Sequence, residues 1–297
     1  MSITCKKIKM AAKLMEKSMN ILFMLCGLLS ILFVILITVF LFISGIPAIK
    51  TIGISDFLFG KVWASTAANP SYGIFPFIMA SVYGTCGAIL IGVPIGLLCA
   101  IFLAKIAPKK ISGIVGNVVD LLAGIPSVVY GLVGMIVIVP CVRETFHLSD
   151  GANLFSAILV LAVMILPSVI SVSETAIKAV PKEYEEASLA LGATKTETVF
   201  KIIVPAAKSG IVTAVVLGIG RAVGEAMAVM MVAGNVANMP KLFGSVRFLT
   251  TAVASEMSYS SGLQRQALFS IALVLFLFIV AINLILNLVV KRGGKNE

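Results

Sequence analysis

Charged side chains are scarce in this chain of 297 residues: Asp, Glu, Lys and Arg together make up 12% of it, whereas apolar residues make up 60%. A soluble globular domain carries about twice that share of charge, so the composition excludes an ordinary soluble protein. The net charge is +10, but Lys and Arg cluster at the ends of apolar runs instead of alternating with aromatics. We therefore expect no nucleic-acid partner and predict an all-α integral membrane protein.

Residues that carry catalytic or metal chemistry are also few. The single histidine, His147, lies in a short polar loop, as a surface histidine does. The cysteines form no C-x-x-C pair and have no His or acid at ligand spacing, so they predict neither disulfides nor a metal site. These cysteines are Cys5, Cys26, Cys86, Cys99 and Cys141. Because no G-x-x-x-x-G-K-[ST] motif and no Ser/His/Asp or paired-carboxylate set occurs, we expect no nucleotide site and no enzymatic activity.

Long apolar runs with few or no charges predict six membrane-spanning helices, each able to cross about 30 Å of hydrocarbon. The runs cover residues 21–43, 74–104, 111–142, 151–173, 208–240 and 264–290. The first run is too long for a signal-peptide core and no A-x-A site follows it, so we expect an uncleaved span. Polar connections are expected at residues 44–72, which contain Trp63, and at 236–263. Trp63 is read either as an interfacial anchor or as a packing residue.

Two of these runs carry signals for their own geometry. Gly92 and Gly96 in the second run have the G-x-x-x-G spacing that allows another helix to approach closely. The third run is interrupted by Gly124, Ile125 and Pro126. A proline removes a backbone donor and disfavours helix at the preceding residue, so a break is predicted there.

The distribution of Lys and Arg predicts the topology. With the amino terminus inside, the inner segments hold 16 Lys and Arg and the outer loops hold 6. Lys and Arg are enriched in cytoplasmic loops, so both termini and residues 181–205 are expected in the cytoplasm. The amino-terminal tail contributes Lys6, Lys7, Lys9, Lys13 and Lys17 to this bias.

Residues 181–205 form the longest charged interruption of the apolar sequence and predict two short helices. Pro181 suits a first helical position, and the acidic residues after it favour a helix start. Gly192 suits a left-handed helix end. Thr194 and Glu197 have the spacing of a capping box, which starts the second helix. We therefore expect two helices joined by a glycine elbow.

This stretch resembles the E-A-A loop of binding-protein-dependent ABC importer permeases, with matching spacings throughout. The matching positions are Glu186, Ala187, Ser188, Gly192, Ile202, Val204 and Pro205. Ser188 stands for a second Ala and Val204 for a Leu. The resemblance implies that residues 181–205, with Glu185 included, form a docking loop whose first helix sits in a groove of an ATPase subunit. The alternative is an amphipathic helix resting on the membrane surface.

Ionisable residues inside the predicted spans are the other functional candidates. Arg221 and Glu225 are four residues apart in the fifth run and are expected on nearly one helix face, where an ion pair can form. They would either line a substrate path or simply neutralise each other during insertion. Asp120 is expected close to the cytoplasmic end of the third span, in a structural role rather than a gating one.

The segments around these charges resemble the PstC-type permeases of bacterial phosphate importers. They are IPSVVYGLVG from Ile125, YGIFPFI from Tyr72 and GRAVGEAMAVMMVAGN from Gly220. The resemblance implies a six-span helical bundle of the type I importer permease (MetI-like) fold in the bacterial inner membrane. It assigns Arg221 and Glu225 to the phosphate path or its gating.

The same resemblance implies the organisation and the partners. Residues 1–72 would hold the basic cytoplasmic tail, the first span and an external loop. Residues 73–291 would form the transmembrane domain, and residues 292–297 a second cytoplasmic tail. Expected partners are a sister permease of PstA type, an ATPase dimer of PstB type that binds ATP and Mg, an external phosphate-binding protein of PstS type, and lipid. No cofactor is expected on this chain.

Three alternatives stay open at this point. The same machine could carry another oxyanion, such as molybdate or sulfate. An ion-coupled secondary carrier would need no ATPase, although the internal repeat usual in that class is not visible here. A membrane-bound enzyme or a purely structural membrane protein would have only Asp120 and the Arg221/Glu225 pair available for chemistry.

Overall fold

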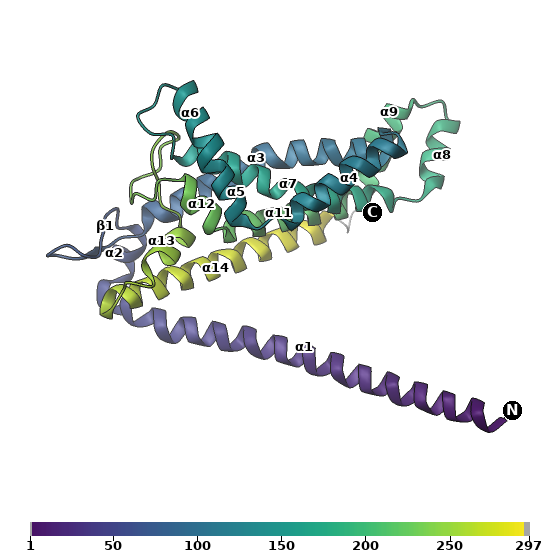
Figure 1. Cartoon of the computed structure of the whole chain (residues 1–297), viewed down its shortest axis with the longest axis horizontal. Coiled ribbons are helices and arrows are strands. Elements are labelled where there is room, and N and C mark those ends of the chain that lie inside the picture. Colours follow the sequence, from purple (N-terminus) through teal and green to yellow (C-terminus); the bar gives the residue numbers. More distant parts are fainter. Residues whose placement is uncertain (1, 294–297) are drawn as a thin grey trace.

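The computed structural model describes the backbone of residues 2–293 and the side chains of residues 13 and 15–285, and it is almost entirely helical (Figure 1). The side chains of Lys6, Lys7 and Lys9 in the expected basic tail, and all side chains of the expected tail at 292–297, lie outside the described residues. Five helical stretches are long and apolar enough to span a membrane: Met15–Ile52, Phe75–Ile106, Ser127–Thr145, Leu154–Lys178 and Gly262–Ile285. A sixth is the pair Lys195–Ala206 and Lys208–Gly224, bent by 70°. The predicted all-helical membrane fold is confirmed.

Helix α7 (Leu154–Lys178) is the centre of the bundle and packs against α3 (Phe75–Ile101) and α11 (Lys208–Gly224). Gly92 and Gly96 of α3 face α7 so closely that an added Cβ would lie 2.7 Å from Ile165 and 2.8 Å from Val169. The predicted close approach of a neighbouring helix is therefore confirmed, and it brings the second and fourth spans together.

Helix α1 (Ser2–Ile52) is longer than the predicted first span. Residues 44–52 were expected in a polar loop, but they are helical, because Ser44–Ile52 still contains mostly apolar residues and continues a helix that packs on α14 (Gly262–Gly293). Ser270 Oγ of α14 donates a hydrogen bond to the carbonyl oxygen of Gly45 at 2.5 Å. Toward its amino terminus, α1 leaves the rest of the bundle (Figure 1). Its exposed apolar side chains fit a surface that lipid or another membrane chain covers.

The segments predicted as external polar loops are folded instead. Residues 53–74 contain α2 (Ile54–Phe59) and an antiparallel pair of strands, β1 (Trp63–Ala64) and β2 (Ser71–Tyr72). Residues 236–263 contain α13 (Leu249–Glu256), whose first residues are buried. The two segments share an apolar core that includes Phe57, Trp63, Phe77, Leu249 and Leu268. The indole of Trp63 is 9% exposed, so its role is packing and not interfacial anchoring.

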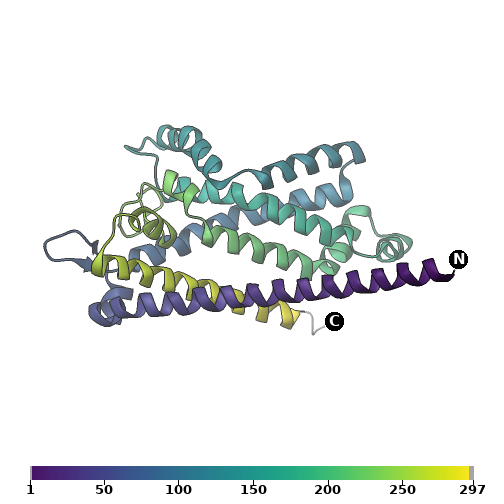
Figure 2. The same cartoon turned by 60° about the horizontal axis from the view of Figure 1, so that its bottom comes forward.

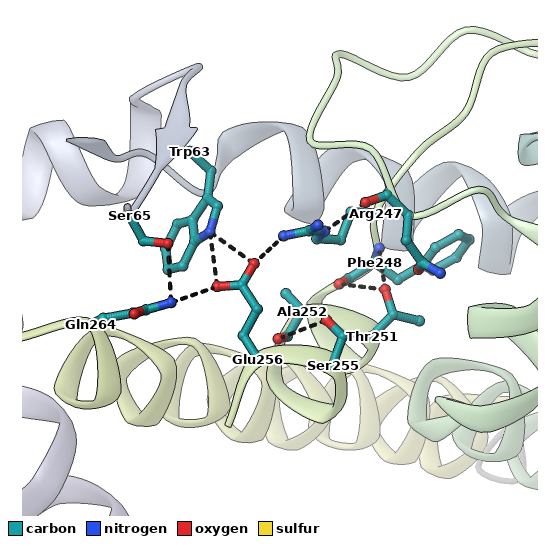
Figure 3. A network of polar contacts seen from close by, with 10 residues as sticks. Trp63, Ser65, Arg247, Phe248, Thr251, Ala252, Ser255, Glu256 and Gln264 are labelled. Carbon is teal, nitrogen blue, oxygen red and sulfur yellow. Dashed lines mark hydrogen bonds and ion pairs between the residues drawn. The ribbon is translucent and has the colours of Figure 1, made fainter. Parts of the chain in front are cut away.

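A polar network inside this outer core joins three distant parts of the chain (Figure 3). Glu256 of α13 pairs with Arg247, and the Trp63 indole N–H donates to the same carboxylate, with N–O distances of 3.3 Å. The Gln264 amide of α14 donates to Glu256 and to Ser65, each at 3.1 Å. One carboxylate therefore holds the strand pair, α13 and the start of α14 together.

Replacement of Glu256 by alanine is expected to destabilise this outer region. The side chains of Arg247 and Glu256 are 18% and 20% exposed, so the variant leaves a largely buried guanidinium without its counter-ion. We expect the free energy of unfolding to fall by about 2 kcal/mol, less than for a fully buried pair. Trp63 is the only tryptophan, so its fluorescence during thermal unfolding reports on this region. Glu144→Ala is the matched control, because the Arg143–Glu144 pair is 53% and 75% exposed; equal midpoints for the two variants would contradict the prediction.

Candidate functional site

The fifth span is broken at the position of its charges. Helix α11 ends at Gly224, Glu225 adopts an extended backbone conformation (φ −74°, ψ 127°), and the short helix α12 (Met227–Val232) follows. The helix in which Arg221 and Glu225 were expected to pair therefore ends before Glu225. They form no ion pair with each other within the described part of the chain. Arg221 lies in the last turn of α11, where the negative end of the helix dipole stabilises a cation.

Glu225 caps the next helix instead of pairing with Arg221. One of its carboxylate oxygens accepts a hydrogen bond from the backbone N–H of Ala228 at 2.9 Å. Its backbone carbonyl accepts a hydrogen bond from the Thr250 hydroxyl of α13 at 2.7 Å. A carboxylate at a helix start satisfies a backbone donor that has no helical partner and offsets the helix dipole. The physical reason for the break is thus a competing cap, which begins α12 and ties it to α13.

The run predicted as the third span, residues 111–142, is broken where the sequence predicts it, and only the part from Ser127 to Thr145 is long and apolar enough to span a membrane. Helix α4 (Lys109–Gly124) ends before Ile125, which is extended, and Pro126 precedes α5 (Ser127–Val133). The Tyr130 hydroxyl donates to the carbonyl oxygen of Leu122 at 2.7 Å, so it satisfies one of the free carbonyls at the end of α4. The span then continues through the π-helix η2 (Gly134–Ile138) and α6 (Val139–Thr145).

The two breaks lie next to each other because α5 packs against α12. A Cβ on Gly131 of α5 would lie 2.8 Å from Ala228 Cα of α12, so only glycine allows this approach. Tyr130, one residue before it, lies within electrostatic range of the Arg221 guanidinium. Figure 1 shows α5, α11 and α12 meeting in the same part of the bundle. The structure therefore gathers interrupted backbone, an aromatic hydroxyl and a cation in one region.

The faces beside Arg221 are open. Arg221 is half-buried and has no hydrogen-bond partner among the described side chains. Gly220 and Gly224 on the same helix have no atom within 4 Å of an added Cβ, and neither does Gly124 at the end of α4. Asp120 of α4 is exposed and lies close to the break, before the membrane-spanning stretch Ser127–Thr145, and its expected place at the cytoplasmic end of the third span stays a prediction. The exposed, glycine-rich faces leave room for a solute or a second chain.

The docking loop folds as two helices with a glycine elbow, as predicted. Helix α8 (Lys182–Ala190) is followed by Gly192 with φ +86°, and α9 (Lys195–Thr198) begins with a complete capping box between Thr194 and Glu197. The chain then runs through the π-helix η3 (Val199–Ile203) into α10 (Val204–Ala206). Pro181 is the residue just before α8 rather than its first helical residue.

The capping box also fixes the charge of the elbow. The backbone N–H and the hydroxyl of Thr194 both donate to the Glu197 carboxylate, at 3.1 and 2.9 Å. The backbone hydrogen bond from Thr194, followed by its hydroxyl and by Lys201, lowers the pKa of Glu197 to about 2. The carboxylate is therefore charged at neutral pH, and the capping box keeps its hydrogen bonds there.

The predicted docking residues lie on different sides of the loop. Glu186, Ala187, Gly192 and Pro205 are exposed. Ser188 is buried, and its hydroxyl contacts that of Thr198 at 2.9 Å, so it joins the two helices. Glu185 is not free, because its carboxylate lies 2.6 Å from Lys105 Nζ. The exposed surface carries large apolar side chains too: Tyr184 is 53% exposed and Leu191 is 90% exposed.

Sequence reasoning missed Lys105 as a partner of the docking loop. It also missed the pair of Arg247 and Glu256. Lys105 and Glu185 are 80 positions apart, and nothing in the spacing of a basic turn indicates which acid it meets. The second pair was hidden in a segment interpreted as a polar connection.

Comparison with known proteins gives matches over most of the chain. The family described as binding-protein-dependent transport system inner membrane component matches residues 92–294. The probable ABC transporter permease protein YqgH of Bacillus subtilis (strain 168) is 40% identical over 267 residues, covering 87% of this chain and 86% of that protein. The phosphate transport system permease protein PstC of Pasteurella multocida (strain Pm70) is 34% identical over 287 residues, covering 88% of this chain and 90% of that protein.

Solved structures show the same fold at lower identity. A chain of the inward-facing MetNI methionine ABC transporter superposes with a TM-score of 0.58 at 20% identity, covering 74% of this chain and 97% of that chain. A chain of a bacterial alginate importer of the ABC class gives 0.57 at 15% identity, covering 82% and 92%. The predicted importer-permease architecture is therefore confirmed.

Proposed function

This chain belongs to the binding-protein-dependent transport system inner membrane components, and we propose that it is the permease subunit of an ATP-driven importer of inorganic phosphate. Relatives that are 30 to 34% identical over most of their length are phosphate transport system permeases. In this proposal the chain provides half of a transmembrane path and catalyses no reaction itself.

The observation that carries the proposal is the state of Arg221. Its guanidinium lies between two helix breaks without an acidic partner among the described residues, because Glu225 is occupied by α12. A guanidinium is a planar group with several donors and suits the oxygens of an oxyanion. A free cation beside an open face is what an anion path requires. The idea that Glu225 neutralises Arg221 in the resting state gains no support from this geometry.

The partners follow from what the chain leaves open. The unoccupied faces at Gly124, Gly220 and Gly224 suit a sister permease of PstA type, which would close the path. The exposed docking loop suits a dimer of PstB-type ATPases, which would bind ATP and Mg, and a PstS-type protein would deliver phosphate from outside. We place the chain in the bacterial inner membrane with both termini in the cytoplasm, because the Lys and Arg bias favours that orientation.

The substrate is tested by transport in proteoliposomes. The co-expressed complex with the phosphate-binding partner is expected to accumulate labelled phosphate at least about tenfold faster than sulfate or molybdate, which corresponds to about 1.4 kcal/mol of discrimination. Uptake should stop when ATP is omitted. Faster uptake of molybdate or sulfate would assign the permease to another oxyanion. Accumulation by this chain without any ATPase would instead indicate a secondary carrier.

A further inference from the structure

Helix α8 of the docking loop stands away from the bundle (Figures 1 and 2). On one side an open hollow of about 620 Å³ separates it from the ends of α7 and α11, with Ala176, Tyr184 and Gly210 among its lining residues. On another side a second hollow of about 420 Å³ lies between α8 and the end of the second span. Helix α8 packs on α9 and η3, while the two hollows leave space between it and the second and fourth spans.

One polar contact crosses the second hollow. Lys105 Nζ lies 2.6 Å from Glu185 Oε2, and the two side chains are 15% and 36% exposed. Within the part of the chain whose side chains are described, it is the one hydrogen bond or ion pair that joins α8 to the second span and its extension η1. The other side-chain contact of α8, from Ser188 to Thr198, joins it to α9, at the start of the bent helix pair that leads into α11.

Lys105 is connected onward to the region of the helix breaks. It lies in the π-helix η1 (Phe102–Ile106), which continues α3 at its cytoplasmic end. The Ser112 hydroxyl of α4 donates to the carbonyl oxygen of Leu103 in η1 at 3.1 Å. Helix α4 then leads directly to its end at Gly124, where the Tyr130 hydroxyl donates to the carbonyl oxygen of Leu122. A displacement of α8 that pulls on Lys105 therefore reaches the break in the third span through continuous structure.

We propose that Lys105 is a positioning residue, which through its ion pair with Glu185 ties the docking helix to the second span and transmits ATPase movement to the transport path. The inference rests on the proposed function for the identity of the moving partner. It assigns Glu185 to an internal contact and leaves Glu186 and Ala187 of α8, and Leu191 directly after it, as exposed side chains available to the ATPase. Without the pair, part of the movement of α8 is absorbed by the two hollows.

The test uses charge reversal and a charge swap in the co-expressed complex. In Lys105→Glu the two like charges repel. We expect the phosphate transported per ATP hydrolysed to fall about fivefold, the factor that a partly buried pair can supply, while the ATPase still co-purifies. The double variant Lys105→Glu/Glu185→Lys restores the opposite charges and should restore the ratio. Lys178→Glu is the matched control, because Lys178 lines the same hollow and pairs at 2.6 Å with Glu174 of its own helix; its ratio should stay near that of the wild type.

A second readout does not depend on the transported solute. A spin label at Glu183, an exposed residue in the first turn of α8, reports the mobility of the docking helix in a cysteine-free background. Lys105→Glu should increase the mobility and the charge swap should reverse the increase. Unchanged mobility in Lys105→Glu would overturn the proposed tie, whatever the complex transports. Increased mobility with an unchanged ratio would overturn its role in transmission. A wild-type complex that transports no phosphate would instead refute the proposed function. The mobility measurement would then still test whether the Lys105–Glu185 ion pair holds α8 to the second span.

Discussion

Replacement of Arg221 by alanine is expected to abolish phosphate uptake while the complex still assembles. Arg221 is half-buried in the last turn of α11, and its guanidinium has no hydrogen-bond or ion-pair partner among the described residues. Its removal therefore leaves no buried polar group unpaired and should reduce the stability of the fold little. An oxyanion would lose two charge-assisted hydrogen bonds of about 1.5 to 3 kcal/mol each, which predicts a fall of at least about a hundredfold in transport. The measurements are ATP-driven phosphate uptake and phosphate-stimulated ATPase activity, with co-purification as the check on assembly.

Two companion variants separate the chemistry of Arg221 from its charge. Arg221→Lys keeps a cation but loses the planar fork, so partial uptake with weaker phosphate dependence is expected. Glu225→Gln keeps an oxygen that can accept from Ala228 N–H and removes the carboxylate charge. Because Glu225 does not pair with Arg221 in the structure, this variant should assemble normally and retain more uptake than Arg221→Ala. Normal uptake in Arg221→Ala would remove Arg221 from the path.

The sequence predicts those features that depend on neighbouring residues. Pro126 interrupts the helix through its own missing backbone N–H, whatever packs around it. The spacing of Thr194 and Glu197 lets these two residues form a capping box within one helical turn. Gly192 provides a positive φ at the elbow without any tertiary contact. The Gly92–Gly96 pair indicates close approach, but only the structure identifies α7 as the approaching helix.

Long-range competition explains what the sequence does not predict. A spacing of four residues allows an ion pair between Arg221 and Glu225, but the Glu225 carboxylate instead accepts a hydrogen bond from Ala228 N–H at the start of α12. Periodicity cannot show that Thr250, 25 positions later, hydrogen-bonds to the carbonyl of Glu225 and fixes the break. The same reason applies to Glu256, whose partners come from residues 63, 247 and 264.

Removal of residues 183–192 is expected to release the ATPase from the membrane complex. The deletion takes away most of α8 and its exposed side chains, including Tyr184 and Leu191, whose combined apolar surface is the main contact available to a groove-shaped partner. It should leave the bundle intact, because α8 adds no residue to the buried apolar core of the cytoplasmic end in the described chain. Co-purification and membrane flotation of the ATPase measure the loss, which we expect to be complete.

A point substitution distinguishes docking from loop folding. Leu191 is 90% exposed, so its replacement should not change the stability of the loop. Leu191→Asp places a charge in the groove of the ATPase and should therefore weaken ATPase binding by about tenfold or more. Lys195→Asp changes charge on the neighbouring helix α9 and serves as the control. If both the deletion and Leu191→Asp keep full ATPase binding, the loop lies on the membrane surface as an amphipathic segment. Release by the deletion alone would place the contact on Tyr184 and Ala187, because those side chains share the exposed surface of α8 and are untouched in Leu191→Asp.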